Sequence, residues 1–193
     1  RLADLLYEVG TMRKLARMHR QVLMTDDLSD NIATHSFRVA IIGALRAEME
    51  GADVSKVVLM CLLHDFGEVR SNDHNCVHKR YVTIDEEAIR NEQLGSLPTP
   101  LFASIAGEYM ARQTKEAKLG KDADLLDQIL LLREYEWQGN KEARTWLYGK
   151  GKKVGKRRIQ NLQFKSSQRL GEALYTREPS QWWEHLWTSK NKK

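Results

Sequence analysis

Hydrophobic positions recur at helical spacing along much of the chain, and no segment shows the alternation of apolar and polar residues that is typical of a β-strand. His35, Val39 and Ile42 share one face at i, i+4 and i+7 spacing. Either Asp30 or Asn31 could cap the N-terminus of this helix. The pattern predicts a helix that continues to about residue 50.

A second apolar stripe begins after Asp53, which is a candidate N-cap. Its members recur at helical spacing and are Val54, Val57, Val58, Cys61 and Leu62. The stripe leads directly into the dipeptide His64-Asp65. Residues 66–80 are polar and mixed in character, so we expect turns there.

Further helices are predicted where the chain is periodic and free of its three prolines, which stand at positions 98, 100 and 179. The predicted ranges are 2–9 and 11–24 with a break near Gly10, 84–94, 100–118, 123–137 after a cap at Asp122, a basic amphipathic 155–176, and a short helix after Pro179 that holds Trp182, Trp183 and Trp187. We find no repeat and no clear linker. We therefore expect one compact all-α domain over residues 1–193, with a core at about 10–140 and a basic helical extension at about 141–193.

Charge is unevenly distributed between the predicted core and the predicted extension. Residues 1–140 hold 17 basic and 22 acidic residues, a balance of −5, whereas residues 141–193 hold 14 and 4, a balance of +10. A basic segment could bind nucleic acid or a phosphorylated ligand, but a solvated lysine-rich surface is the commoner explanation. The apolar runs are too short to cross a bilayer, and two cysteines are too few for a disulfide framework, so we expect a cytoplasmic protein.

Four polar residues stand on predicted apolar faces, where neutral core residues would be expected: His35, His64, Asp65 and Asp124. A carboxylate buried without a partner costs several kcal/mol, so each aspartate there requires a cation or a hydrogen-bond network. Two imidazoles and two carboxylates suit a divalent transition metal with positions left open for water. A single histidine on such a face is more often a core residue, so only the combination indicates a metal site.

The order H…HD…D resembles that of the HD-domain metal-dependent phosphohydrolases, and more closely that of the bacterial 5′-deoxynucleotidase branch. Three segments carry the resemblance: residues 31–36 (NIATHS), residues 64–69 (HDFGEV) followed by Asp73, and residues 121–124 (KDAD). The family fold is all-α, in agreement with the helical periodicity. The resemblance implies that His35, His64, Asp65 and Asp124 bind the metal ion.

The resemblance also implies roles for residues outside the metal site. Glu68 would take part in proton transfer, and Asp73 would be a second catalytic acid. Arg20, 15 residues before His35, occupies the place of an arginine that contacts the substrate phosphate, with Arg17 as a competitor one turn earlier. Lys79 matches a family lysine that could add positive charge near the phosphate.

One departure from the family concerns the sugar. Gln21 stands where the family has a tryptophan that crowds the 2′ position, which leaves selectivity for deoxyribose open.

These observations predict a hydrolase that removes the 5′-phosphate from nucleoside or deoxynucleoside monophosphates with a metal-activated water. Manganese, cobalt, iron, nickel, zinc and magnesium all remain candidates for the divalent ion. Hydrolysis of nucleoside triphosphates or of a nucleotide second messenger is an alternative. A nucleic-acid or protein-binding module with a vestigial metal site is an alternative of another class. The resemblance implies a homodimer.

Overall fold

The computed structural model of the chain describes residues 1–150, 155–156 and 158–186. The fold is all-α, as predicted: the described residues contain helices and turns but no strand, apart from an isolated bridge between Ala16 and Asn31. The chain forms two compact units, Arg1–Asp127 and Gln128–Lys193. The division falls inside helix α8 (Lys115–Trp137), and the proposed core and extension boundary near residue 140 stays a prediction.

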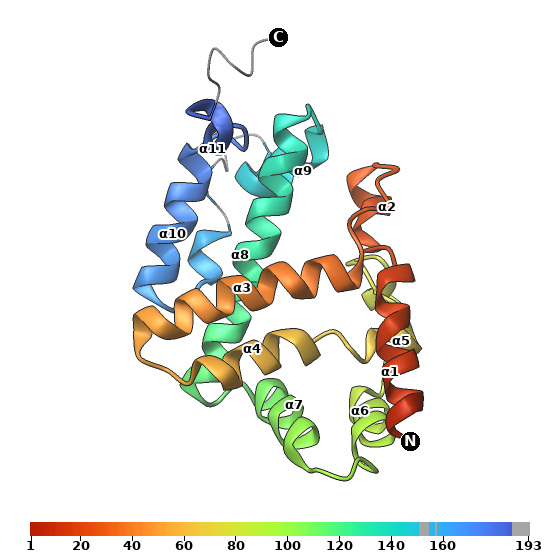
Figure 1. Ribbon diagram of the computed structural model, residues 1–193. Helices are drawn as coiled ribbons and strands as arrows, with labels where there is room; N and C mark the ends of the chain where they lie inside the picture. Colours follow the sequence, from red (N-terminus) through yellow and green to blue (C-terminus); the bar gives the residue numbers. More distant parts are fainter. Residues whose placement is uncertain (151–154, 157, 187–193) are drawn as a thin grey trace. The chain divides into compact units, whose positions relative to one another are not determined.

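The first unit contains most of the helices, which Figure 1 shows in chain order. They are α1 (Leu2–Thr11), the 3-10 turn η1 (Met12–Lys14), α2 (His19–Leu23), α3 (Ile32–Glu50), α4 (Val54–Leu63), α5 (Glu68–Ser71), the 3-10 turn η2 (His78–Arg80), α6 (Glu86–Leu94), α7 (Leu101–Ala111) and the beginning of α8.

The two predicted helices on either side of residue 52 are confirmed with their caps. Asn31 is the N-cap of α3, where its side chain accepts from the Thr34 backbone N–H while the Thr34 hydroxyl accepts from the Asn31 N–H. Asp53 caps α4 by accepting from the Lys56 N–H at 3.0 Å. These caps fix where each helix starts, and so they fix which residues face the interior.

The helix predicted over 11–24 is wrong for much of its length. Gly10 lies inside α1, and the chain leaves the helical conformation after η1. Here the Arg17 N–H donates to the Asp30 carbonyl at 3.0 Å, and the Ile32 N–H donates to the Leu15 carbonyl at 2.9 Å. Pairing with a distant segment therefore replaces local helical bonds, and it holds residues 15–17 beside the start of α3.

The helix predicted over 100–118 is two helices. Helix α7 ends at Ala111, and its C-cap Arg112 has a φ of 55° in the left-handed region, while α8 begins at Lys115. The Thr114 hydroxyl accepts from the Ala117 N–H at 3.2 Å and so starts α8. Asp122, predicted as a cap, is instead a buried residue within α8.

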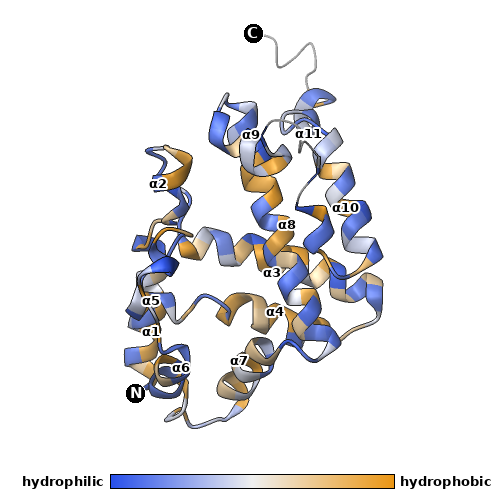
Figure 2. Ribbon diagram, turned by 180° about the vertical axis from the view of Figure 1, so that it is seen from behind, coloured by the Kyte–Doolittle hydropathy of each residue, from blue (hydrophilic) through white to orange (hydrophobic). Residues whose placement is uncertain are grey.

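The core of the first unit lies between α3 and α4, with α7 packed on α4. Figure 2 shows the hydrophobic residues along α4 and α7 that this packing covers. Val39, Val57 and Cys61 are fully buried, and Met60 packs with Ile105 in a cluster that continues onto α7. Burial at this density leaves the ends of α3 and α4 rigid, which positions the polar residues described below.

The second unit has its own small core. After the last turns of α8 it contains α9 (Lys141–Tyr148), the 3-10 turn η3 (Ile159–Asn161), α10 (Lys165–Thr176) and α11 (Gln181–Glu184). Leu147, Leu162 and Tyr175 are buried, and the Tyr175 hydroxyl donates to the Leu147 carbonyl at 3.1 Å.

One helix prediction for the second unit is wrong at its start, and one predicted residue is not described by the structure. The basic amphipathic helix starts at Lys165 rather than at residue 155, and Trp187 lies outside the described residues. Among the helices that the structure describes, none is both long enough and apolar enough to cross a membrane.

Gly43 marks the closest approach of α3 to α4 and generates a test of this packing. A Cβ at Gly43 would lie 2.7 Å from Cys61 Sγ and 3.0 Å from Val57 Cγ1. Overpacking costs about 1–3 kcal/mol, against about 1 kcal/mol gained from the helix propensity of alanine. We therefore expect Gly43→Ala to lower the free energy of unfolding by up to about 2 kcal/mol in chemical denaturation.

Gly107→Ala in α7 is the matched control, because a Cβ there meets no atom within 4 Å. This variant should be as stable as the parent or more stable. Equal stability of Gly43→Ala and Gly107→Ala would show that α3 and α4 are not packed as described.

Candidate metal centre

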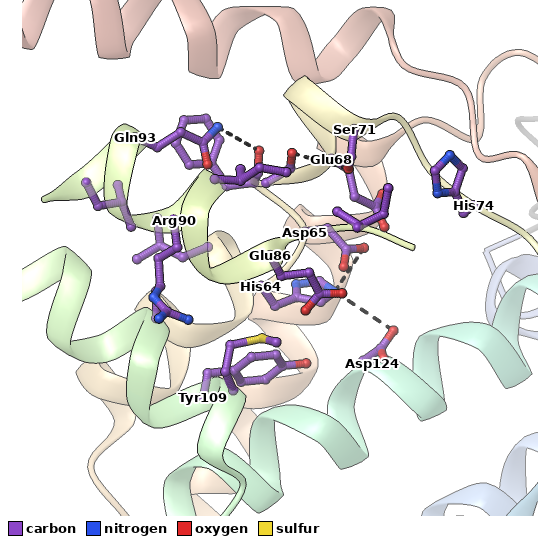
Figure 3. A pocket seen from close by; sticks show the side chains of 18 of the residues that line it. His64, Asp65, Glu68, Ser71, His74, Glu86, Arg90, Gln93, Tyr109 and Asp124 are labelled. Carbon is purple, nitrogen blue, oxygen red and sulfur yellow. Dashed lines mark hydrogen bonds and ion pairs between the residues drawn. The ribbon is translucent and has the colours of Figure 1, made fainter. Parts of the chain in front are cut away.

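Four predicted metal ligands from distant parts of the chain converge in the first unit. His35 lies in the first turn of α3, His64 and Asp65 follow α4, and Asp124 lies in α8. One ligand atom each from His35, His64 and Asp124 lies within 4.8 Å of the others, a spacing that can hold a metal ion. Asp65 Oδ2 lies 3.3 Å from His35 Nε2 and 3.2 Å from His64 Nε2, and Figure 3 shows His64, Asp65 and Asp124 together.

Both imidazole rings are oriented by a hydrogen bond at the nitrogen remote from the cluster. His35 Nδ1 donates to Asp127 Oδ2 at 2.6 Å, and His64 Nδ1 donates to the Cys61 carbonyl at 2.7 Å. A neutral imidazole whose Nδ1 carries the proton presents a lone pair at Nε2. The two Nε2 atoms lie 3.1 Å apart, so their lone pairs and the nearby carboxylates fit a shared cation.

The local sequence explains why His64 and Asp65 are held at the end of α4. The Phe66 N–H donates to the Leu63 carbonyl and the Glu68 N–H donates to the Asp65 carbonyl, which makes a tight turn between α4 and α5. Phe66 is 2% exposed and packs with Ile32, the first residue of α3. The buried Phe66 side chain thus anchors the turn that carries His64 and Asp65.

Burial and the neighbouring charges act in opposite directions on the pKa values of the ionisable groups in this cluster. Burial opposes ionisation of Asp65, but His64, His35 and Arg17 outweigh it and hold the pKa of Asp65 well below its usual range. Burial likewise opposes ionisation of Asp124, and His35 and Lys121 hold its pKa low. The ionised carboxylates then raise the pKa of His35 well above its usual value despite burial. The site therefore concentrates negative charge that a proton or a metal ion must balance.

Arg17, rather than Arg20, is the arginine that the structure brings to this cluster. Arg17 Nη1 lies 2.9 Å from Asp65 Oδ2, and its Nε lies 3.7 Å from Asp73 Oδ2. Arg20 is paired at 3.8 Å with Asp26, which is fully exposed, and neither arginine lines the pocket described below. The preference for Arg20 over Arg17 thus finds no support in the geometry, and a role of Arg20 in phosphate binding stays a prediction.

The two predicted catalytic acids occupy different surroundings. Glu68 lines the pocket, and its Oε2 is buried without a hydrogen-bond partner. Burial, followed by the charges of Asp65 and Asp73, raises the pKa of Glu68 to about 9. Asp73 is 6% exposed, accepts from the Met18 N–H and pairs with Arg17, but it does not line the pocket.

A pocket of about 260 Å³ opens beside His64, Asp65 and Asp124. Its volume is close to the lower end of small-molecule sites, which are roughly 300–1,000 Å³. Its walls combine apolar side chains with four carboxyl groups and four cationic groups. The carboxyl groups belong to Asp65, Glu68, Glu86 and Asp124, and the cationic groups to Lys79, Arg90, Arg112 and Lys121. With a cation bound to the carboxylates, such walls would suit an organic molecule that carries an anionic group. Lys79 lines this pocket, and its role near a phosphate stays a prediction.

Asp127 is the functional residue that sequence reasoning missed most clearly. It holds His35 and also accepts from Arg38 Nε, and it is 3% exposed. Its position three residues after Asp124 puts both carboxylates on one face of α8, a spacing that could have identified it.

Comparisons with known proteins agree with this geometry. The HD domain family matches residues 12–163 of the chain. The 5′-deoxynucleotidase HDDC2 of Dictyostelium discoideum is 30% identical over 126 residues, which cover 58% of this chain and 66% of that protein. The match thus spans just under two thirds of the length of this curated relative.

Two solved structures share the fold. A conserved hypothetical protein from Pyrococcus furiosus has a TM-score of 0.70 and 27% identity, with 90% of this chain and 96% of that chain covered. A predicted metal-dependent phosphohydrolase from Magnetospirillum magnetotacticum has a TM-score of 0.65 and 22% identity, with 90% and 89% covered, and this second likeness shows the fold alone.

The hydrogen bond from His35 to Asp127 generates a prediction about metal affinity. In Asp127→Ala the His35 ring loses the acceptor that sets its tautomer, so the affinity for Mn²⁺ should fall about 10–100-fold. Calorimetric titration with Mn²⁺ measures this. Asp26→Ala, which removes a fully exposed carboxylate, should leave the affinity unchanged. An Asp127→Ala protein that binds Mn²⁺ as tightly as the parent would refute the role of Asp127.

Proposed function

Since this chain belongs to the HD domain family, we propose that it is a metal-dependent phosphohydrolase that removes the 5′-phosphate from nucleoside or deoxynucleoside monophosphates. The observation that carries the proposal is the convergence of His35, His64 and Asp124, with both Nε2 lone pairs turned toward the same point. This cluster lies beside a pocket whose lining includes four Lys and Arg side chains. This arrangement combines a metal site with space for an anionic organic molecule.

The metal ion would be held by His35, His64, Asp65 and Asp124, since their donor atoms fit one divalent cation of the transition series. When bound, such a cation supplies a Lewis acid that lowers the pKa of water and polarises a phosphoryl oxygen. Asp127 and the Cys61 carbonyl keep the two imidazoles in the tautomer that leaves Nε2 free.

The phosphate group would be bound by cationic side chains near the cluster. The Arg17 guanidinium lies against Asp65, so a phosphate that reaches Asp65 would also be near Arg17. A guanidinium presents paired N–H donors that match phosphate oxygens, and Lys79 adds a positive charge on the pocket wall. These contacts accelerate hydrolysis only as far as they favour the transition state over the bound substrate.

Hydrolysis breaks the bond between phosphorus and the 5′ oxygen, and that oxygen must take up a proton. The raised pKa of Glu68 keeps its carboxyl protonated near neutral pH, and its free Oε2 faces the pocket residues. Glu68 is therefore the proton donor in this proposal. Asp73 keeps Arg17 in place through their ion pair, which supports a positioning role beside the catalytic one expected from the sequence.

The substrate class rests on the named relative and on the pocket. The Dictyostelium protein is a 5′-deoxynucleotidase, and the pocket walls provide apolar contacts through Ile84, Ile89 and Met110 for an organic group. A nucleoside triphosphate or a nucleotide second messenger remains the alternative substrate. The cytoplasmic location and the homodimer stay predictions from the sequence.

The direct experiment is a phosphate-release screen of nucleoside mono- and triphosphates with Mn²⁺, Co²⁺, Ni²⁺, Zn²⁺, Fe²⁺ or Mg²⁺. We expect release from monophosphates with one or more ions, and none from Asp65→Ala. Release from triphosphates alone would support the alternative substrate. Absence of release from every nucleotide, together with nucleic-acid binding that weakens steeply with salt, would support the non-enzymatic alternative.

Glu68 provides a test of the proton donor. Gln cannot supply the proton, so Glu68→Gln should lower kcat roughly 10²–10⁴-fold while Mn²⁺ affinity is retained. Steady-state phosphate release and calorimetry measure the two quantities. Glu48→Gln, at an exposed position on α3 that does not line the pocket, is the control and should keep the parental kcat. Parental turnover in Glu68→Gln would exclude Glu68 as the donor.

Arg17 and Arg20 can be separated by matched substitutions. Because hydrogen bonds to charged groups contribute about 1.5–3 kcal/mol, Arg17→Gln should lower kcat/KM about 10–100-fold. Arg20→Gln should change kcat/KM by less than about threefold, a change typical of an exposed ion pair. The same phosphate-release assay measures both. A larger loss in Arg20→Gln than in Arg17→Gln would favour the assignment made from the sequence.

A further inference from the structure

Two polar groups on the pocket wall have no role in the reaction described so far. Tyr109 lies in the last turn of α7, and Arg112 follows as the C-cap of that helix. The Tyr109 hydroxyl and Arg112 Nη1 are both buried and have no hydrogen-bond partner among the described residues. Buried donors without a partner cost about 1–3 kcal/mol, so their presence in a pocket indicates a ligand that they bind.

The position of Tyr109 ties it to the metal centre. Tyr109 is 2% exposed, and its ring packs edge-on against that of His64 with the centroids 5.7 Å apart. Figure 3 shows its hydroxyl directed to the side of the pocket where Asp124 lies. A phenol hydroxyl is a hydrogen-bond donor near neutral pH, so Tyr109 can donate to a group that enters this side of the pocket.

Arg112 is held over Tyr109 by stacking. Its guanidinium carbon lies 3.3 Å from the centroid of the Tyr109 ring, and the left-handed backbone at Arg112, with a φ of 55°, turns the chain at the end of the helix. A stacked guanidinium keeps its N–H groups in its own plane, where they remain available to a ligand.

In its pairing Arg112 differs from Arg90 and Lys121, two of the other three cations of the pocket wall. Lys121 Nζ lies 2.6 Å from Asp124, and Arg90 lies 3.8 Å from Glu87. Among the residues that the structure describes, Arg112 makes no ion pair with a carboxylate. Arg112 thus brings positive charge to the pocket that no neighbouring carboxylate neutralises.

We propose that Tyr109 and Arg112 form a donor pair that binds a non-bridging phosphoryl oxygen of the substrate. A phenol and a guanidinium beside each other both donate, so the group that they bind must accept, and the charge of Arg112 selects an anionic acceptor. The pair shares the pocket with Asp124, so the phosphoryl group would lie between the metal ligands and α7. This inference rests on the proposed function, because it places a phosphate in this pocket.

Inorganic phosphate is the probe, and the protein is first saturated with Mn²⁺. Arg112→Gln should weaken phosphate binding about 10–100-fold, and Tyr109→Phe about threefold to tenfold, in isothermal titration calorimetry. Both variants should bind Mn²⁺ within about twofold of the parent, measured by electron paramagnetic resonance. Tyr109→Phe keeps the ring and the stack, so it tests the hydroxyl in a folded protein.

Two substitutions of the same chemical type serve as controls. Arg13→Gln and Tyr7→Phe change exposed residues of the same unit that do not line the pocket. Both should retain parental phosphate affinity, so a general effect of lost charge or of a lost hydroxyl would be visible in them.

The outcomes separate this inference from the proposed function. Parental phosphate affinity in both pocket variants would overturn the donor pair, even if the parent hydrolyses nucleotides. Loss of Mn²⁺ in either variant would also overturn it, because the residues would then act on the metal site. Weaker phosphate binding with unchanged Mn²⁺ binding would support the donor pair, even if the nucleotide screen finds no substrate.

Discussion

The close approach of two imidazole nitrogens among carboxylates is the constraint on which this site depends. His35 and His64 face each other through Nε2 at 3.1 Å, and in each ring Nδ1 is already committed to an acceptor. Lone pairs at that distance repel unless a positive charge lies among them. Asp65 and Asp124 add further negative charge at the same point. A bound cation would resolve this conflict, and the chemistry proposed for the pocket depends on it.

The helices around the cluster are built to keep these groups in place. The cap at Asn31 fixes the first turn of α3, and the close packing of α3 on α4 fixes the end of α4 that carries His64. The bridge between Ala16 and Asn31 holds Arg17 against Asp65, at the cost of the helix that the local sequence would favour. Rigid elements of this kind reduce the reorganisation required when a charged substrate binds.

Much of this arrangement could be predicted from the sequence because it depends on local patterns. Helical periodicity and capping residues located α3 and α4, and the order of His35, His64 and Asp124 pointed to the metal site. The pairing of residues 15–17 with residues 30–32 could not be predicted, because it depends on contacts between distant segments. The preference for Arg20 over Arg17 came from its spacing to His35 in the family resemblance, and spacing along the chain does not show that Arg17 lies against Asp65.

The break between α7 and α8, inside the helix predicted over 100–118, could not be predicted either. Local helix propensity does not reveal the left-handed residue that follows α7. That break places Arg112 over Tyr109 and gives the pocket a wall that the sequence did not suggest.

X-ray absorption spectroscopy of the Co²⁺-loaded protein tests the central claim most directly, because it counts imidazole ligands on the ion itself. The geometry predicts one Co²⁺ per chain with two imidazole nitrogens and carboxylate oxygens, and one imidazole fewer in His35→Ala or His64→Ala. A spectrum with oxygen ligands alone, unchanged in both variants, would contradict the account.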